Sequence, residues 1–183
     1  MRVEDVARLV HEAPLFGDLD DVCLEALARY GDIATFPDGA LLGRQGTPAD
    51  RFFVILGGGV ALEAREPGCP PTPIDSLGPG EVVGWSWLSA PYRWHFDVRA
   101  SGPVRAVAIE AEALRVAMTG DDHLASQLLR RFTAVLIRRL QATRHRMLTA
   151  GPSSWYDSGG TSCAEIPQGA SGVTPTRPPP RRP

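Results

Sequence analysis

Turn-forming residues recur at short, regular intervals through the middle of the chain, and they constrain its fold most strongly. Over residues 32–109, short apolar stretches alternate with clusters of Gly, Pro and Asp, such as Pro37–Gly39 and Gly57–Gly59. Turn signals at this spacing are typical of many short strands that close into a sandwich or roll. Segments 96–100 and 105–109 also alternate in polarity, as half-buried strands do. This region is therefore predicted to be mainly β.

Helical periodicity flanks the β region on both sides. Apolar residues recur at helical spacing over 3–10, and a second helix is predicted from an N-cap at Asp18 to a stop at Gly31. After the β region, the pattern predicts a short helix over 110–118 and a long helix over 121–148. The expected architecture is a β-roll between an N-terminal helical part and two C-terminal helices.

The long helix carries an apolar seam whose members are spaced by three and four residues. The seam consists of Leu129, Phe132, Leu136, Leu140, Thr143 and Met147. This spacing resembles a coiled coil, so a homodimer through the 121–148 helix is predicted. The same helix carries six arginines. A solvated face on a dimerising helix explains them better than nucleic-acid contact does.

Composition and organisation limit the function classes. The 19 basic residues are all arginine, against 21 acidic residues, and the net charge is −2. Without lysine, a Walker-type phosphate loop and a Schiff-base enzyme are excluded. We expect one domain over 1–148, with the roll at about 32–109 and helices at about 110–148, and a disordered Pro/Gly/Ser-rich tail over 149–183. No membrane span or signal sequence is recognisable, so a cytoplasmic protein is predicted.

Signatures of catalysis or metal binding are weak. Ser86 lies in a segment that begins like a nucleophile elbow but lacks the closing glycine. The four histidines are scattered, and the three cysteines are far apart. Cys23 shares a helical stripe with Leu19 and Leu27, so a buried, inert thiol is expected. We therefore predict no catalytic residue, no metal site, no resident cofactor and no enzyme activity.

The segment from Leu77 to Ala100 is the most unusual part of the chain. Its glycines can present backbone N–H groups to an anion, Glu81 can accept hydrogen bonds from a ribose hydroxyl, and Arg93 can pair with a phosphate. A tight turn followed by a strand plugged with aromatic side chains explains the same residues without a ligand. The residues alone leave both interpretations open.

Several motifs in the same order resemble the cyclic nucleotide-binding domain, the sensor half of the cAMP receptor protein. They are the stretch from Pro37 to Ile55, the glycine turn at 57–59, Pro79-Gly80-Glu81, Val98-Arg99-Ala100 and the helix segment 138–143. The resemblance covers about Leu15 to Leu148. It implies a double-stranded β-helix (jelly roll) of eight strands and a long C-terminal helix that pairs two subunits.

The resemblance also implies a ligand site. Gly80 and Glu81 match a Gly-Glu pair that opens the phosphate-binding cassette, in which the glutamate holds the ribose. Arg93 is the candidate for the phosphate, and Thr143 matches a helix threonine that reaches the purine in some relatives. Counted back from Val98, however, Trp94 stands at the place of the arginine, and Arg93 precedes it by one residue. A one-residue offset on a strand turns a side chain to the opposite face.

The expected function is that of a stand-alone regulatory or sensory module that binds cAMP, cGMP or a related nucleotide. Two alternatives remain open: a ligand-free interaction module whose pocket is filled by aromatic side chains, and a relative of transcription regulators that lacks their helix-turn-helix. Only the low-complexity tail follows the long helix in this sequence, so direct DNA binding is not expected.

Overall fold

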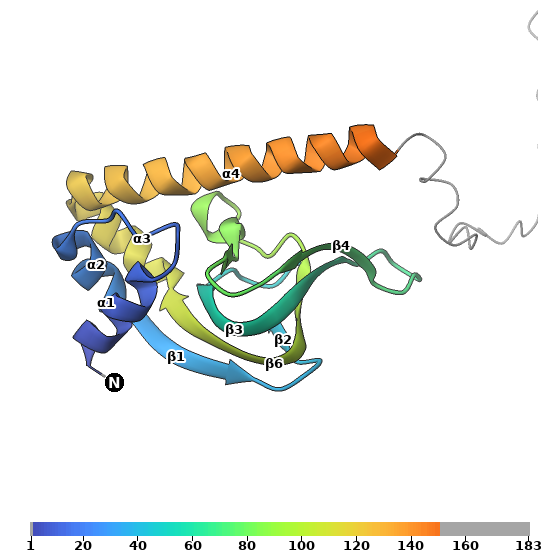
Figure 1. The fold of residues 1–183 in the computed structure, drawn as a ribbon, viewed down its shortest axis with the longest axis horizontal. Coiled ribbons are helices and arrows are strands. Elements are labelled where there is room, and N and C mark those ends of the chain that lie inside the picture. The colour runs from blue at the N-terminus through green and yellow to red at the C-terminus, as the bar shows by residue number, and fades with distance from the viewer. Residues whose placement is uncertain (1, 151–183) are drawn as a thin grey trace, which may run out of the picture.

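The computed structural model describes residues 2–150, so the predicted tail lies outside the described residues from 151 onward. Figure 1 shows a bent β-roll with short helices at one end and a long helix across its open side. The helices are α1 (Val3–His11), α2 (Asp21–Ala28), the 3₁₀ helix η1 (Trp85–Leu88), α3 (Ala111–Gly120) and α4 (Asp122–Ala150). The strands are β1 (Gly31–Phe36), β2 (Leu41–Gly43), β3 (Arg51–Ala64), β4 (Thr72–Leu77), β5 (Val82–Val83) and β6 (Asp97–Glu110).

The strands form one antiparallel sheet in the order β1-β6-β3-β4, with β2 paired to β6 and β5 paired to β3. The long strands β3 and β6 pair along most of their length, and the register shifts around Gly57 and Gly59. Gly58 has a φ of +81°, and a Cβ atom there would lie 2.2 Å from the carbonyl oxygen of Pro103. The sheet therefore bends within continuous strands. As a result, the described residues contain six strands, whereas the resemblance implied eight.

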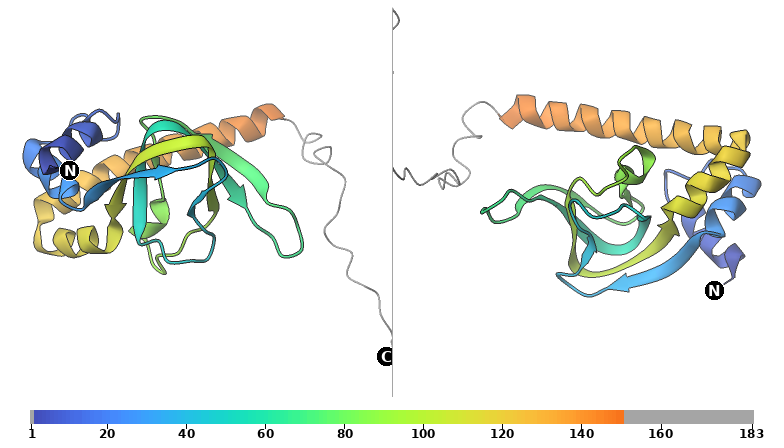
Figure 2. Two further views of the ribbon diagram at one scale, coloured as in Figure 1. Left: turned by 90° about the horizontal axis from the view of Figure 1, so that it is seen from below. Right: turned by 180° about the vertical axis from the view of Figure 1, so that it is seen from behind.

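The N-terminal helices lie at the end of the roll where α3 and α4 begin (Figure 2). The predicted N-cap of α2 is wrong by two residues. Asp20 is the cap, and its Oδ1 accepts the backbone N–H of Cys23 at 2.8 Å. Asp18 instead pairs with Arg131 on α4, with 3.2 Å between the carboxylate Oδ1 and Nε. Either aspartate is a suitable N-cap residue by type. The contact of Asp18 with Arg131 on α4 distinguishes it from Asp20, which caps the helix.

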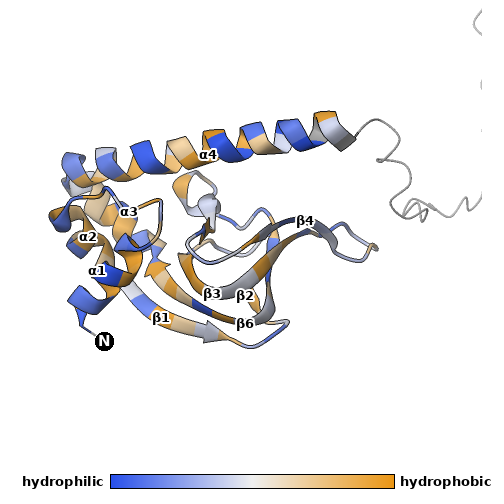
Figure 3. Cartoon of the chain, in the orientation of Figure 1, coloured by the Kyte–Doolittle hydropathy of each residue, from blue (hydrophilic) through white to orange (hydrophobic). Residues whose placement is uncertain are grey.

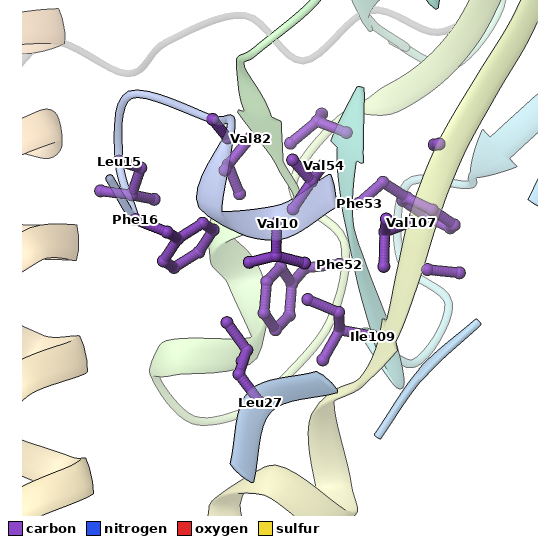
Figure 4. Close-up of a cluster of buried hydrophobic side chains, with 14 of the residues drawn as sticks. Val10, Leu15, Phe16, Leu27, Phe52, Phe53, Val54, Val82, Val107 and Ile109 are labelled. Atoms are coloured by element: carbon purple, nitrogen blue, oxygen red, sulfur yellow. The ribbon is translucent and has the colours of Figure 1, made fainter. Parts of the chain in front are cut away.

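The core joins these helices to the concave side of the sheet. Figure 4 shows Val10 from α1, Phe16 from the loop after it and Leu27 from α2 pointing toward Phe52 and Ile109 of the strands. All five side chains are fully buried. In Figure 3, α1 and α2 carry both apolar and polar residues, and α4 alternates between apolar and polar stretches along its length. The helical end and the roll therefore share one hydrophobic core.

The predicted seam of α4 is divided between two faces of the helix. Phe132 is 1% exposed and meets the rings of Phe16, Phe52, Trp85 and Trp87 at centroid distances between 5.3 and 6.1 Å. Leu129, Leu136 and Leu140 are exposed. The side chain of Met147 lies outside the described residues. A single continuous seam is therefore wrong, because the inward stripe runs through Leu124, Leu128 and Phe132.

None of the helices in the described part of the chain is sufficiently long and apolar to cross a membrane.

Candidate functional site

The segment between β5 and β6 lines the interior of the roll. Gly84, which joins β5 to η1, has a φ of +106°, in the left-handed region that favours glycine. A Cβ atom at this position would lie 2.8 Å from the Trp94 ring and 3.1 Å from the Cα atom of Phe52. Glycine therefore allows η1 and Trp94 to pack directly against β3.

Trp94 fills the space between β2 and β3. Its side chain is 6% exposed and stacks on Phe53, with ring centroids 6.3 Å apart and an interplanar angle of 21°. A Cβ atom on Gly43 would lie only 2.5 Å from the indole. The Trp94 backbone pairs with the loop after β2, donating to Thr47 and accepting from Gly46. The residue at the expected arginine place is therefore a buried aromatic plug.

Arg93 is exposed on the outside of the roll. Its Nη1 donates to the carbonyl oxygen of Gly46 at 2.7 Å, in the loop that also holds Trp94. The opposite burial of Arg93 and Trp94 is what an extended backbone gives to neighbouring residues. A phosphate inside the roll would therefore meet the indole of Trp94, with the Arg93 guanidinium bonded on the outer surface.

The loop after β2, whose Gly46 carbonyl accepts the Arg93 hydrogen bond, is also bound by a buried carboxylate. Asp97 is 0% exposed; its Oδ1 accepts the Gln45 N–H at 2.8 Å, and its Oδ2 accepts from Arg65 Nη2 at 2.6 Å. Burial works against ionisation, but the hydrogen bonds from Arg65 and Gln45 outweigh it and hold the pKa of Asp97 below its ordinary value. Asp97 therefore stays charged and anchors the loop.

Gly80 and Glu81 lie in the turn before β5, on the side of the roll that faces α4. Gly80 N–H donates to Ile55 at 2.8 Å, and Glu81 Oε2 accepts the N–H of Gly78 at 2.8 Å, so the carboxylate closes its own turn. The turn lines a cleft of about 360 Å³. Its other walls are Pro14, Leu15, Pro79, Val82, Trp85, Val135, Arg138, Arg139 and Ala142.

Thr143 lies on an exposed part of α4, and its hydroxyl accepts from Arg146 at 3.3 Å. The cleft described above contains Gly80 and Glu81 but neither Arg93 nor Thr143. The four residues predicted as a ligand site are therefore placed in three different surroundings.

The fold brings Ser86 into contact with His95, which the sequence analysis did not pair. Ser86 Oγ lies 2.8 Å from Nδ1 of His95 and also accepts the His95 backbone N–H at 3.3 Å. The pair lines an apolar pocket of about 130 Å³ inside the roll, next to Trp94. No spacing rule connects Ser86 with a histidine nine residues later across an irregular loop.

Asp75 joins the sheet to the last turns of α4. It pairs with Arg139 at 3.3 Å and with Arg146 at 3.1 Å, and Arg139 also lies over the Trp85 ring, 5.8 Å from its centroid. Burial disfavours the charged carboxylate, but hydrogen bonds from Arg146 and from the N–H of Ser76 outweigh it and keep the pKa of Asp75 below its ordinary value. The roll, η1 and α4 are thus linked by charged groups as well as by Phe132.

The fold, with a cassette-like segment between two strands and a long helix across it, is of the cyclic nucleotide-binding type. Residues 33–121 match the family model of the cyclic nucleotide-binding domain, which confirms the resemblance. Residues 33–121 are thus similar to this domain, and the match supports a sensory or regulatory module.

Particular relatives agree with this class. A CRP-like cAMP-activated global transcriptional regulator of Mycobacterium tuberculosis is 27% identical over 139 residues, which cover 76% of this chain and 60% of the relative. A solved structure described as a cyclic nucleotide-binding protein of Geobacter metallireducens is 27% identical, with a TM-score of 0.66, over 76% of this chain and 98% of that one. A cyclic nucleotide-binding domain of Methylobacillus flagellatus is 23% identical, with a TM-score of 0.68, over 81% and 84%. The chain thus spans less than two thirds of the mycobacterial regulator.

Proposed function

We propose that this chain is a regulatory module in which Trp94 occupies the place of the ligand phosphate, so that it acts through protein contacts without a cyclic nucleotide. The burial of Trp94 between Gly43, Phe53 and Gly84 carries this proposal. This function corresponds to the ligand-free interaction module with an aromatic-filled pocket, which the sequence left open.

Physical chemistry supports the plug. A cyclic phosphate carries a charge, and burying a charge without a partner is strongly unfavourable. The interior pocket next to Trp94 is lined mainly by apolar side chains and measures about 130 Å³. Typical ligand pockets measure about 300–1,000 Å³. The guanidinium of Arg93 donates to the carbonyl oxygen of Gly46 and does not line this pocket.

Titration calorimetry of the full chain with cAMP and with cGMP tests the proposal. The mycobacterial relative, described as cAMP-activated, serves as the positive control. We expect no saturable heat and no thermal shift for the wild-type chain, and the same for Arg93→Ala. Saturable binding that Arg93→Ala abolishes would overturn the proposal, because the arginine would then have to reach a ligand.

A second candidate function is cyclic nucleotide binding in the cleft between the Gly80–Glu81 turn and α4. The cleft volume of about 360 Å³ and two arginines on its wall, Arg138 and Arg139, favour it. The variants Glu81→Ala and Arg138→Ala distinguish this site from the roll interior. If the nucleotide binds here, both substitutions weaken binding, whereas Arg93→Ala leaves it unchanged.

We also propose that two copies of the chain pair through α4. The supporting observation is the exposed apolar face of this helix, which comprises Leu129, Leu136, Ile137 and Leu140, each at least 42% exposed. Exposed apolar residues at helical spacing favour a helix–helix interface. Analytical ultracentrifugation should give a dimer for the wild-type chain and a monomer for Ile137→Glu. A wild-type monomer at high micromolar concentration would contradict this arrangement.

A further inference from the structure

Three potential metal ligands meet where α2 and α4 begin. Asp20, Cys23 and His123 each offer one ligand atom, and these atoms all lie within 4.8 Å of one another. Asp20 caps α2, Cys23 lies three residues later in the first turn, and His123 is the second residue of α4. Asp20 and His123 are 103 residues apart in sequence, so the sequence spacing does not reveal the cluster.

The two carboxylate oxygens of Asp20 contact different groups. Oδ1 accepts the Cys23 backbone N–H at 2.8 Å and caps α2. Oδ2 lies 2.7 Å from Nε2 of His123. A cation can therefore bind Oδ2 while the helix cap on Oδ1 stays intact.

Burial gives the cluster an inner and an outer side. Cys23 is 1% exposed, so its sulfur forms the inner wall. The side chains of Asp20 and His123 are 41% and 58% exposed, which leaves the outer side open to solvent. A cation can thus enter from water and reach the thiol, and a water molecule can remain bound on the outer side.

The donor types and distances suit zinc. Zinc binds Cys sulfur at about 2.3 Å and His nitrogen or carboxylate oxygen at about 2.0–2.2 Å, which places the donors of a tetrahedral site about 3.3–3.6 Å apart. Oδ2 of Asp20 and Nε2 of His123, which lie 2.7 Å apart, would have to separate by about 0.6–0.9 Å to reach that spacing. The charge of the nearby Asp121 favours a cation, while that of Arg131 opposes it.

We propose that Asp20, Cys23 and His123 form a binding site for zinc or a similar thiophilic divalent cation, with water as the fourth ligand. The Cys23 sulfur exchanges its bond to hydrogen for a bond to the metal, and the proton passes to solvent without any redox change. The ion would connect the start of α4 to the start of α2. This property goes beyond the proposed function and does not depend on it.

Cobalt substitution tests the site, because a thiolate bound to Co²⁺ gives a charge-transfer absorption band. The untagged, reduced full chain is titrated with CoCl₂ and then with ZnCl₂, which should displace the cobalt at a stoichiometry of one. His123→Gln should weaken binding at least tenfold, and Cys23→Ser should abolish the charge-transfer band. Asp20→Asn keeps the ability to cap the helix and should also weaken binding. His145→Gln, on the exposed part of α4, is the matched control and should bind as the wild type does.

Two results would overturn the site. One is the absence of a charge-transfer band in the wild type at cobalt concentrations up to the millimolar range. The other is an unchanged band and affinity in His123→Gln, which would show that His123 is not a ligand of the metal. Because His123 is exposed, its substitution leaves the core intact, and circular dichroism of each variant verifies the fold.

Discussion

Replacing Phe132 by alanine should be among the most damaging single substitutions on α4. The ring is 1% exposed and contacts four other aromatic rings. About 150 Å² of buried ring surface at about 25 cal/mol per Å² gives a loss of about 4 kcal/mol. Direct measurements of Phe→Ala in protein cores span about 3–5 kcal/mol. The melting temperature should fall by roughly 8–16 °C for a domain of this size.

Leu136→Ala is the matched comparison, one turn further along the same helix. Its side chain is 42% exposed, so the substitution should lower the free energy of unfolding by less than about 1 kcal/mol in the monomer. Urea unfolding at two protein concentrations separates the two faces. The Phe132 loss should not depend on concentration, whereas a Leu136 loss that grows with concentration would report the proposed dimer.

The reverse ranking would refute the inward placement of Phe132. If Phe132→Ala lost less than about 1 kcal/mol while Leu136→Ala lost several in the monomer, α4 would pack on the roll through its other face.

Three further substitutions test the charged and glycine contacts of the site. Asp75→Asn should lower the free energy of unfolding by about 0.5–1 kcal/mol at pH 7. Because the pKa of Asp75 in the folded protein lies below its ordinary 3.8, the difference between wild type and variant should vanish as the pH falls through the lowered pKa. Urea unfolding at a series of pH values measures this difference. Asp97→Asn should cost about 2 kcal/mol, since it removes a charged partner of Arg65, and chemical unfolding measures the loss. Gly84→Ala should cost about 2–4 kcal/mol through backbone strain and contact with Trp94, measured as a lower urea midpoint.

The general class of the fold could be predicted because its signals are local. Glycine and proline at turns, alternation on strands and helical periodicity are properties of a few neighbouring residues. The number of strands could not be predicted, because a glycine that bends a continuous strand looks the same in sequence as a glycine in a turn. Gly57–Gly59 lie within β3, where the partner strand continues past them. Only the pairing of β3 with β6 in the folded protein distinguishes a bend within a strand from a turn between strands.

Contacts across long sequence separations account for the remaining differences. The choice between Asp18 and Asp20 as a cap depends on Arg131, which lies on another helix. The offset of Arg93 was visible by counting back from Val98, but the fit of Trp94 between Gly43 and Gly84 needs three segments in place. The contacts of Asp75 with Arg139 and Arg146 have no signal in sequence spacing, because they join β4 to α4 across more than 60 residues.

The contacts of α4 differ in strength along its length, and this difference determines where a signal can act. Its first turns are held by the buried Leu124 and Leu128 as well as by the exposed pair of Asp20 and His123, whereas its last turns are tied to β4 by Asp75. Exposed or half-exposed pairs of this kind contribute little to stability. Phe132, between them, contributes about 4 kcal/mol through apolar burial, which neither pH nor a bound cation alters. A binding event of a few kcal/mol can therefore release the C-terminal end of α4, where Asp75 holds it, while Leu124, Leu128 and Phe132 keep its N-terminal half docked on the roll.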